Sequence, residues 1–491
     1  MKHFAATWLG LACFALSFPA GSVEPRILWE WNAENSSIPA GAELIRQPGE
    51  KPFLRVRGPE APAFPIDGAL LKGKMVTVEG VVRGEKLGQE FGDCLKLVPN
   101  YRPFDKYREN WGYRPGPPVP REKSGWERHA GSWRIPPYAG DFKLVLADAG
   151  KNGLAEYREI RILEVPAPEP PSPGLNRAPL QKTPQYRGAM AGALKEEEDF
   201  RIFAEEFGGN LLRWQFLQGG PAVFQTTERY LAWGRDRIAE LKQVLPYCHK
   251  YKIKVVIDLH RSPGEMNAIN NNLGLWTAER QQAVVLLWRE IAEAFKGDSA
   301  IYGYDLVNEP IDKVYDVRSD ALDWDRFAEK LAREIRAIDP DTPIIVATSY
   351  NPRPINLPNI IYSPHFYEPG EYTHQGIRGR AMVGPYPDPS KGWNREWLRL
   401  MAEPTRQFQL KYNVPIYVGE FGVIRWAPGG AQWLDDWISI FEEYGWDWSY
   451  HAYREWSGWS VEHSDDKTIE QPVGDTARGQ VIRKYFRRNQ R

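Results

Sequence analysis

The chain has 491 residues, 42% of them hydrophobic and 26% charged, a composition typical of a globular protein with room for two domains. Its 63 basic and 64 acidic residues give a formal net charge of −1, so neither nucleic acid nor an anionic membrane surface is an expected partner. The 20 Trp and 23 Tyr side chains either fill cores or offer flat apolar faces on which sugar rings can stack.

The amino terminus has the pattern of an export signal. Residues 1–22 combine Lys2 with an apolar run and small residues around Ala20. The run is too short for a membrane span and no basic flank follows it, so we expect a cleaved signal peptide and a secreted or periplasmic protein without a membrane anchor. Cys94 and Cys248 then remain, far apart, and no disulfide framework is predicted.

Residues 24–163 alternate apolar and polar positions in short runs, such as KMVTVEGVVRG, that Gly, Pro and Asp separate. This pattern predicts an antiparallel β-sandwich. The segment resembles the jelly roll of carbohydrate-binding modules, with a purely structural sandwich as the alternative. The aromatic residues that carry the resemblance are Trp29, Trp31, Tyr101, Trp111, Tyr113, Trp126 and Trp133. The proline-rich residues 164–184 predict a semi-rigid linker.

From residue 185 to residue 491 strands and helices alternate, which predicts an α/β fold with a parallel sheet. The predicted strands are RGAMAGA, NLLRWQF, IKVVIDLH, IYGYDLVNEP, TPIIVATS, NIIYSPHFY, VPIYVGEFG and WDWSYHAY. The predicted helices cover residues 194–207, 229–251, 278–295, 324–338, 395–412, 432–444 and 476–487. Eight such strands predict a (β/α)8 TIM barrel.

Catalytic groups of such a barrel lie where the strands end. The polar residues at these predicted ends are Arg213, His260, Asn308, Glu309, His365, Tyr367, Glu420 and His451. Two carboxylates facing one cleft are what cleavage of a glycosidic bond requires, because one protonates the leaving oxygen while the other attacks or activates water. Pro310 ends the strand pairing after Glu309 and fixes the turn that presents it.

The motifs YDLVNEP and IYVGEFG resemble the acid/base and nucleophile motifs of glycoside hydrolase family 5, the cellulase-type retaining glycosidases. NLLRW, VVIDLH and HFY support this resemblance, which spans roughly residues 185–465. It implies that Glu309 is the general acid/base and Glu420 the nucleophile. It further implies that the sugar or these two carboxylates are held by Asn308, Arg213, Tyr367, His260 and His365.

One position departs from the family pattern. The family often places a tryptophan at the end of strand 8 as a floor for the sugar, and His451 stands there in this chain. Trp456 or Trp448 is then expected to supply the platform. The loop residues Trp276, Trp393 and Trp426 either line a cleft or pack loops.

These observations predict an endo-β-1,4-glucanase that acts as a monomer on β-glycan polysaccharide or oligosaccharide by double displacement. No cofactor is expected, and no metal site, because the eight histidines lack paired-ligand spacing. A β-mannanase or another β-glycan hydrolase on the same fold remains an alternative. A non-catalytic glycan-binding protein is the alternative from another class.

Overall fold

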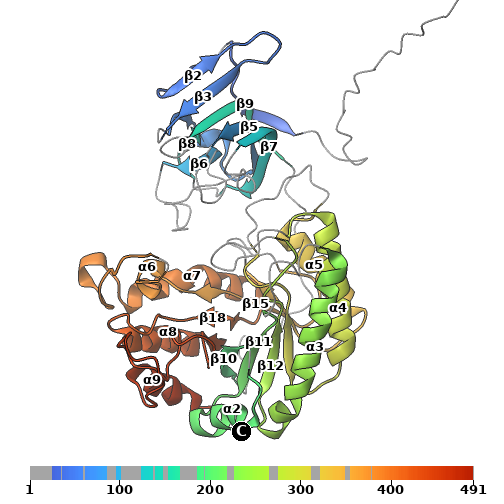
Figure 1. Ribbon diagram of the computed structural model, residues 1–491, viewed down its shortest axis with the longest axis vertical. Helices are drawn as coiled ribbons and strands as arrows, with labels where there is room; N and C mark the ends of the chain where they lie inside the picture. The colour runs from blue at the N-terminus through green and yellow to red at the C-terminus, as the bar shows by residue number, and fades with distance from the viewer. Residues whose placement is uncertain are drawn as a thin grey trace, which may run out of the picture. The chain divides into compact units, whose positions relative to one another are not determined.

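The computed structural model describes residues 25–34, 36–58, 61–85, 95–100, 123–135, 139–146, 153–165, 185–192, 194–217, 226–264, 275–310, 321–348, 354–377 and 379–489. These residues form two compact units, one up to residue 165 and one from residue 185 (Figure 1). The predicted signal peptide and residues 166–184 of the predicted linker lie outside the described residues.

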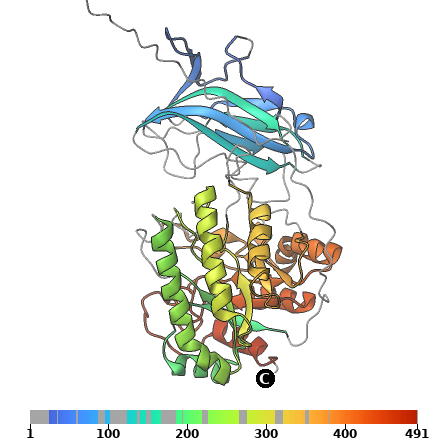
Figure 2. The same cartoon turned by 90° about the vertical axis from the view of Figure 1, so that its right-hand side faces the viewer.

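The first unit is built from antiparallel strands in two sheets. The larger sheet has the order β2-β3-β9-β5-β7, with β1 paired to β9, and the smaller sheet has the order β4-β8-β6 (Figure 2). The larger sheet consists of β1 (Arg26–Glu30), β2 (Ala42–Ile45), β3 (Phe53–Arg57), β5 (Met75–Glu85), β7 (Lys123–Arg134) and β9 (Leu154–Glu164). The smaller sheet consists of β4 (Ala63–Ile66), β6 (Leu95–Pro99) and β8 (Phe142–Leu146), and a short 3₁₀ turn, η1 (Gly68–Leu70), follows β4.

One hydrophobic cluster joins the two sheets of this unit. It contains Val76 and Val78 of β5 together with Leu97 of β6 and Leu144 of β8. Alternate residues of each strand enter this cluster, as the period of two in the sequence requires. The antiparallel strands predicted for residues 24–163 are therefore present.

The second unit is a nearly closed parallel barrel. Its eight-stranded sheet has the order β15-β14-β13-β12-β11-β10-β19-β17, and a parallel bridge between Tyr362 and Ile416 links the two ends. The strands are β10 (Arg187–Ala191), β11 (Leu211–Gln215), β12 (Lys254–Asp258), β13 (Ile301–Asp305), β14 (Ile344–Ala347), β15 (Ile360–Ser363), β17 (Tyr417–Val418) and β19 (Asp447–Tyr450). Two further short strands, β16 (His365–Phe366) and β18 (Glu420–Phe421), pair in parallel just beyond β15 and β17. The predicted TIM barrel is confirmed.

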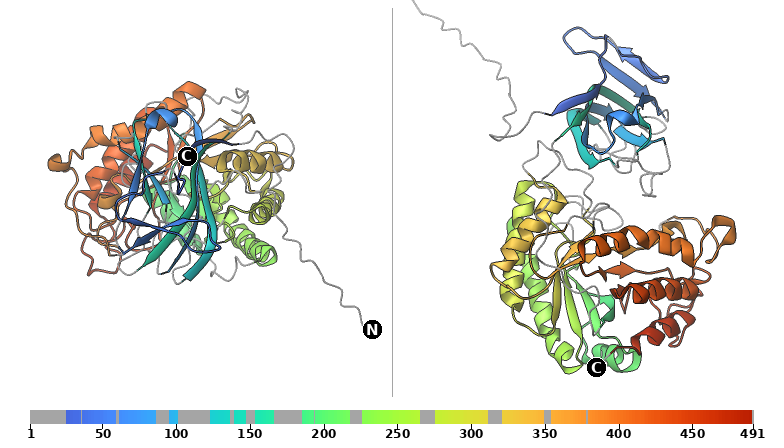
Figure 3. Two further views of the ribbon diagram at one scale, coloured as in Figure 1. Left: turned by 90° about the horizontal axis from the view of Figure 1, so that it is seen from above. Right: turned by 180° about the vertical axis from the view of Figure 1, so that it is seen from behind.

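Helices follow the strands on the outside of the barrel, with α3, α4 and α5 packed together and α7, α8 and α9 in a second group (Figures 1 and 3). They are α2 (Glu197–Arg201), η2 (Ile202–Phe207, a π-helix), α3 (Thr227–Lys250), α4 (Ala278–Phe295), α5 (Trp324–Arg336), α6 (Gly370–Thr373), η4 (Pro389–Lys391), α7 (Arg395–Tyr412), α8 (Gly430–Tyr444) and α9 (Ala477–Phe486). Each predicted helix is present, with ends shifted by at most three residues. No helix among the described residues is both long and apolar enough to cross a membrane.

The helix starts follow from capping residues. The side chains of Thr226, Thr277, Asp323 and Asn394 each accept a hydrogen bond from the backbone N–H three residues on. These caps satisfy amide groups that have no partner inside the helix. The short α6 and η4 were not predicted, because one turn leaves no periodic pattern in a sequence.

The inside of the barrel changes character along the strands. An apolar layer comes first, made of Leu211, Val256, Tyr302, Ile345, Ile361 and Tyr417. Two residues further along β11 and β12 stand Arg213 and Asp258, both with no exposed side-chain surface. Since every second residue of a strand points inward, charge follows directly on the apolar layer toward the carboxyl ends of the strands.

Gly188 allows β10 to pack closely on β11. A Cβ atom at Gly188 would lie 1.9 Å from the carbonyl oxygen of Leu211, which is backbone and cannot rotate away. Close packing therefore explains Gly188 in the RGAMAGA strand.

We expect Gly188→Ala to lower the free energy of unfolding by about 1–3 kcal/mol, because the added methyl group forces two strands apart. Gly370→Ala is the matched control, since nothing lies within 4 Å of its Cβ position. Urea denaturation of both variants measures the effect. Equal unfolding midpoints for the two variants would show that the barrel tolerates the displacement.

Candidate active site

The two predicted carboxylates lie close together at the carboxyl ends of the strands. Glu309 follows β13 and Glu420 opens β18. A carboxylate oxygen of each and a ring nitrogen of His365 all lie within 4.8 Å of one another. The Glu420 side chain is 6% exposed and the Glu309 side chain 29%. The two carboxylates that the strand-end rule selected therefore do lie together.

Glu420 is held by two direct hydrogen bonds. Arg213 Nη1 donates to Oε1 over 2.7 Å, and the Tyr367 hydroxyl donates to Oε2 over 2.9 Å. Burial alone would raise the pKa of Glu420, but the positive charges of His365 and Arg213 outweigh it and hold that pKa well below its ordinary range. Glu420 is thus kept ionised, which a nucleophilic carboxylate requires.

Arg213 is the centre of a buried ionic network. Its Nη2 lies 3.0 Å from Asp258 Oδ1 and 2.8 Å from Asp305 Oδ2. Burial would lower the pKa of Arg213, but the charges of Asp258, Asp305 and Glu420 outweigh burial and raise it. Burial raises the pKa of Asp305 to about 6 despite its contact with the guanidinium. Arg213 therefore stays protonated, while Asp305 holds a proton more readily than an ordinary aspartate.

Asn308 is oriented by the same network. Arg213 Nη2 donates to its Oδ1 over 3.0 Å, and its Nδ2 lies 3.3 Å from His260 Nε2. His260 Nδ1 lies 2.7 Å from Asp258 Oδ2. With Asp258 ionised, Nδ1 carries the hydrogen and Nε2 accepts from the amide. The Asn308 side chain is thereby fixed in one of its two possible flips.

Asp258 and Asp305 were not predicted from the sequence as site residues. Each stands at the end of an otherwise apolar strand, VVID and YGYD, and is at most 1% exposed. A carboxylate in such a buried position needs a cation, and Arg213 at the end of the neighbouring NLLRW strand was the available one. An aspartate at the end of each of two apolar strands, next to a strand ending in arginine, could therefore have predicted this ionic network from the sequence.

Glu309 is placed by its backbone and by His365. Its φ of 40° lies in the left-handed region, although Pro310 follows and favours extended conformations at the preceding residue. His365 Nδ1 lies 2.9 Å from Glu309 Oε1 and 3.7 Å from Glu420 Oε2. Burial would lower the pKa of His365, but the two carboxylates outweigh burial and raise it.

The glycines of VGEFG make room for this arrangement. A Cβ at Gly419 would lie 2.5 Å from Ser363 Oγ and 3.0 Å from His365 Nε2. A Cβ at Gly422 would lie 2.6 Å from the carbonyl oxygen of His451. The glycines on either side of Glu420 therefore let two neighbouring segments approach it.

His451 follows β19 and faces Tyr367. Its Nδ1 lies 2.7 Å from the Tyr367 hydroxyl and its Nε2 lies 3.3 Å from Glu455 Oε1. Trp459 stacks on the imidazole with ring centroids 5.0 Å apart. Glu455 and Trp459 were not predicted, because both lie on a loop whose path the strand pattern does not determine.

The tryptophans suggested as sugar platforms or cleft residues differ in how far they are exposed. Trp448 is fully buried and stacks on Phe486 of α9, so the suggestion that it supplies a sugar platform is wrong. Trp456 is 46% exposed and contacts Trp459 and Trp426 edge-on. Trp393 is buried, and the partly buried Trp276 and Trp426 pack against the main hydrophobic core.

In the part of the chain that the structure describes, Glu309, His365 and Glu420 form the only grouping of three side chains near enough to share a metal ion. Their polar atoms already bond one another, Arg213 and Tyr367. The positive charge beside Glu420 is thus supplied by the protein itself.

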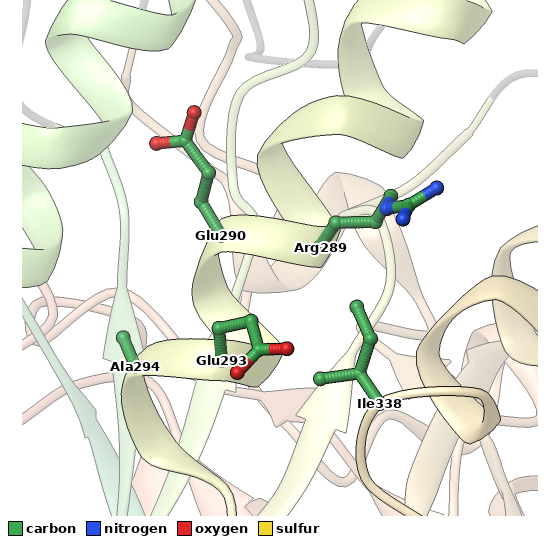
Figure 4. A pocket seen from close by; sticks show the side chains of 5 residues that line it. All are labelled: Arg289, Glu290, Glu293, Ala294 and Ile338. Carbon is green, nitrogen blue, oxygen red and sulfur yellow. The ribbon is translucent and has the colours of Figure 1, made fainter.

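A surface hollow between α4 and the segment after α5 lies on the helical outside of the barrel (Figure 4). Arg289 and Glu290 line it, and each is paired with another surface residue, Glu334 and Arg235 respectively. None of the strand-end residues belongs to it.

Comparison with known proteins gives a family match over the barrel. Residues 179–459 match the family described as cellulase (glycosyl hydrolase family 5). Endoglucanase C of Acetivibrio thermocellus is 24% identical in an alignment of 292 positions that covers 51% of this chain and 82% of that protein. Cellodextrinase A of Ruminococcus flavefaciens is 27% identical in an alignment of 235 positions that covers 43% of this chain and 66% of that protein. A crystal structure of a hyperthermophilic endo-beta-1,4-glucanase in complex with substrate is 22% identical, with a TM-score of 0.47, over 61% of this chain and 96% of that one.

We expect Arg213→Met to lower the free energy of unfolding by about 3–5 kcal/mol, because it leaves buried carboxylates without their cation. Arg235→Met is the control, since the ion pair of Arg235 with Glu290 is exposed, and little change is expected. Urea denaturation at neutral pH compares the two. A similar small loss in both variants would contradict the central role given to Arg213.

Proposed function

Since the chain belongs to glycosyl hydrolase family 5 and is a glycoside hydrolase, we propose that it is an endo-β-1,4-glucanase that retains the anomeric configuration. In this proposal Glu420 is the nucleophile and Glu309 the general acid/base. One observation carries it, which is that carboxylate oxygens of the two residues lie within 4.8 Å of each other. Retaining enzymes hold their carboxyl groups about 5–5.5 Å apart, whereas inverting enzymes need about 6.5–9.5 Å to admit a water molecule.

The first step forms a glycosyl ester. Glu420 attacks the anomeric carbon while Glu309 gives its proton to the leaving oxygen, so one glycosidic bond breaks and one ester bond forms. In this proposal Asn308, which Arg213 and His260 hold in one orientation, bonds the sugar 2-hydroxyl as positive charge develops on the ring.

In the second step Glu309 acts as a base instead of an acid. Glu309 gave up its proton in the first step, so it meets the glycosyl ester as a carboxylate. Glu309 then takes a proton from water as the water oxygen attacks the anomeric carbon, the bond from that carbon to Glu420 breaks, and the Glu420 carboxylate is released. His365 Nδ1 lies within 3.7 Å of both carboxylates, so it can interact with Glu420 before the ester forms and with Glu309 in both steps.

The choice of β-1,4-glucan rests on relatives named Endoglucanase C and Cellodextrinase A. A β-mannanase, or another β-glycan hydrolase, is the alternative on the same fold, since loops decide which sugar fits. Release of reducing sugar from a panel of soluble glucan, mannan and xylan separates these possibilities. Activity on none of them would favour a glycan-binding role without catalysis.

We also propose that the protein is exported by its amino-terminal signal and that its first unit is a jelly-roll sandwich that binds glycan. Four aromatic residues expected to serve binding are described, and each is buried or packed against another side chain. Trp31 and Trp133 are buried, Trp29 packs on Phe64, and Arg83 and Arg158 each lie 4.3 Å from the Trp126 ring. Binding would rest on Tyr101, Trp111 and Tyr113, which lie outside the described residues.

We expect the first product released from a β-glucan oligosaccharide to be the β-anomer, because two displacements at one carbon restore its configuration. Proton NMR during the first minutes of hydrolysis reads this directly. Initial release of the α-anomer would remove Glu420 from the role of nucleophile.

Two variants serve as controls for this assignment. Glu420→Ala should abolish turnover of every substrate. Glu309→Ala should still cleave aryl glycosides whose leaving group needs no proton, at least in the first step.

We expect inactive full-length protein, Glu420→Ala, to migrate more slowly in a native gel containing soluble β-glucan than in a gel without it. The matched control is the same variant of residues 185–491, which lacks the first unit and should be retarded less. Equal retardation of the two proteins would return the first unit to a purely structural role.

A further inference from the structure

A row of four side chains runs from the loop after β19 to Glu420. Glu455 Oε1 lies 3.3 Å from His451 Nε2, His451 Nδ1 lies 2.7 Å from the Tyr367 hydroxyl, and that hydroxyl lies 2.9 Å from Glu420 Oε2. At both ends stands a carboxylate, and between them stand one hydroxyl and one imidazole. Ionised carboxylates only accept hydrogen bonds, so every hydrogen in this row must come from the hydroxyl or the imidazole.

Counting donors assigns each of those hydrogens. An ionised Glu420 can only accept, so the single Tyr367 proton must point to it. The Tyr367 oxygen is then left to accept, and His451 Nδ1 must carry a hydrogen. The carboxylate of Glu455 likewise accepts, so Nε2 must carry one too. An imidazole with hydrogens on both nitrogens is an imidazolium cation.

We propose that His451 is a positively charged positioning residue, whose imidazolium, held by Glu455, turns the Tyr367 proton toward Glu420 for the attack on the sugar. The inference rests on the proposed role of Glu420 as nucleophile. Tryptophan, which the family often has at the position of His451, could not take this role, because its indole has a single hydrogen-bond donor and carries no charge.

The charges around His451 favour the cation. Glu455 and Glu420 face it with negative charge and Arg213 with positive charge, and His260 faces Glu455. Burial would lower the pKa of His451, but the two carboxylates outweigh burial and raise it. Burial and Glu420 raise the pKa of Tyr367, so this side chain keeps its hydroxyl proton.

The loop that carries Glu455 is fastened at several points. Arg425 N–H donates to the Gly458 carbonyl over 2.8 Å. Arg478 Nη1 and Nη2 donate to the carbonyls of Ser460 and His463, each over 2.7 Å. Glu455 is thus presented to His451 by a segment that buried arginines hold in place, which is what a positioning contact requires.

Loss of one proton from His451 would change which partner the Tyr367 hydroxyl donates to. A neutral ring that keeps its hydrogen on Nε2 for Glu455 offers a lone pair at Nδ1, which competes with Glu420 for the Tyr367 proton. Because the folded-state pKa of His451 is raised, the active cation persists to higher pH and is lost as pH rises through that pKa. The first displacement should slow over the same range.

The test isolates the first displacement from proton donation by Glu309. We would measure kcat/KM against pH for a dinitrophenyl β-cellobioside in the Glu309→Ala background, where the leaving group needs no acid. Adding Glu455→Gln should move the alkaline fall to lower pH by about one unit or more, because the ion pair that raises the His451 pKa is gone. Glu470→Gln, an exposed glutamate on the same loop, is the matched control and should not move it.

A third comparison separates positioning from a simple effect of charge. In a Tyr367→Phe background, Glu455→Gln should no longer shift the alkaline limb, because the hydroxyl that transmits the effect is absent. A shift that persists there, or no shift with Tyr367 present, would overturn the proposal.

A readout without turnover keeps this test distinct from the test of function. NMR of histidine-labelled protein, with the His451 signal assigned through His451→Gln, follows the protonation of the ring itself. We expect a titration midpoint above that of an ordinary histidine and a lower midpoint in Glu455→Gln. An ordinary midpoint that Glu455→Gln leaves unchanged would overturn the proposal, whereas Glu420→Ala with undiminished activity would instead overturn the proposed function.

Discussion

The fully buried guanidinium of Arg213 is the interaction on which the site depends. It bonds Asp258 and Asp305 inside the barrel and Glu420 and Asn308 at its rim. A charge so deep is stable only if its partners are fixed, so the same contacts that compensate the cation also fix Glu420, the proposed nucleophile, and the amide of Asn308. One side chain therefore links the stability of the barrel to the geometry of the candidate site.

The barrel provides this arrangement through the period of two of its strands. Leu211 and Val256 complete an apolar layer, and the next inward positions, Arg213 and Asp258, carry the charges. Strand β19 shows the same rule, since Asp447 bonds the Tyr302 hydroxyl inside the barrel while Trp448 packs outward on α9. Continuing that alternation past the end of β19 turns His451 toward the site.

Most of this could be predicted from the sequence, because strand and helix periods are local and strand ends share one edge of a barrel. Glu309, Glu420, Arg213 and His365 were found in that way and do lie together. Trp448 was misjudged, because its face of β19 was not assigned from the alternation. Glu455 was out of reach, since a contact between a loop residue and a strand end depends on the tertiary path of the loop.

His451, which stands where the family often has tryptophan, adds a positive charge to the site when its imidazole is protonated. A buried imidazolium near the guanidinium of Arg213 is unfavourable unless another carboxylate accompanies it. Glu455 supplies that carboxylate, and burial, which would raise its pKa, is outweighed by His451 so that the pKa is lowered. The histidine and the glutamate therefore form an ion pair at the edge of the site, where the Glu455 side chain keeps 25% of its surface exposed and the His451 side chain 14%. Trp459 stacks on the imidazole and limits the orientations open to the ring between Glu455 and Tyr367.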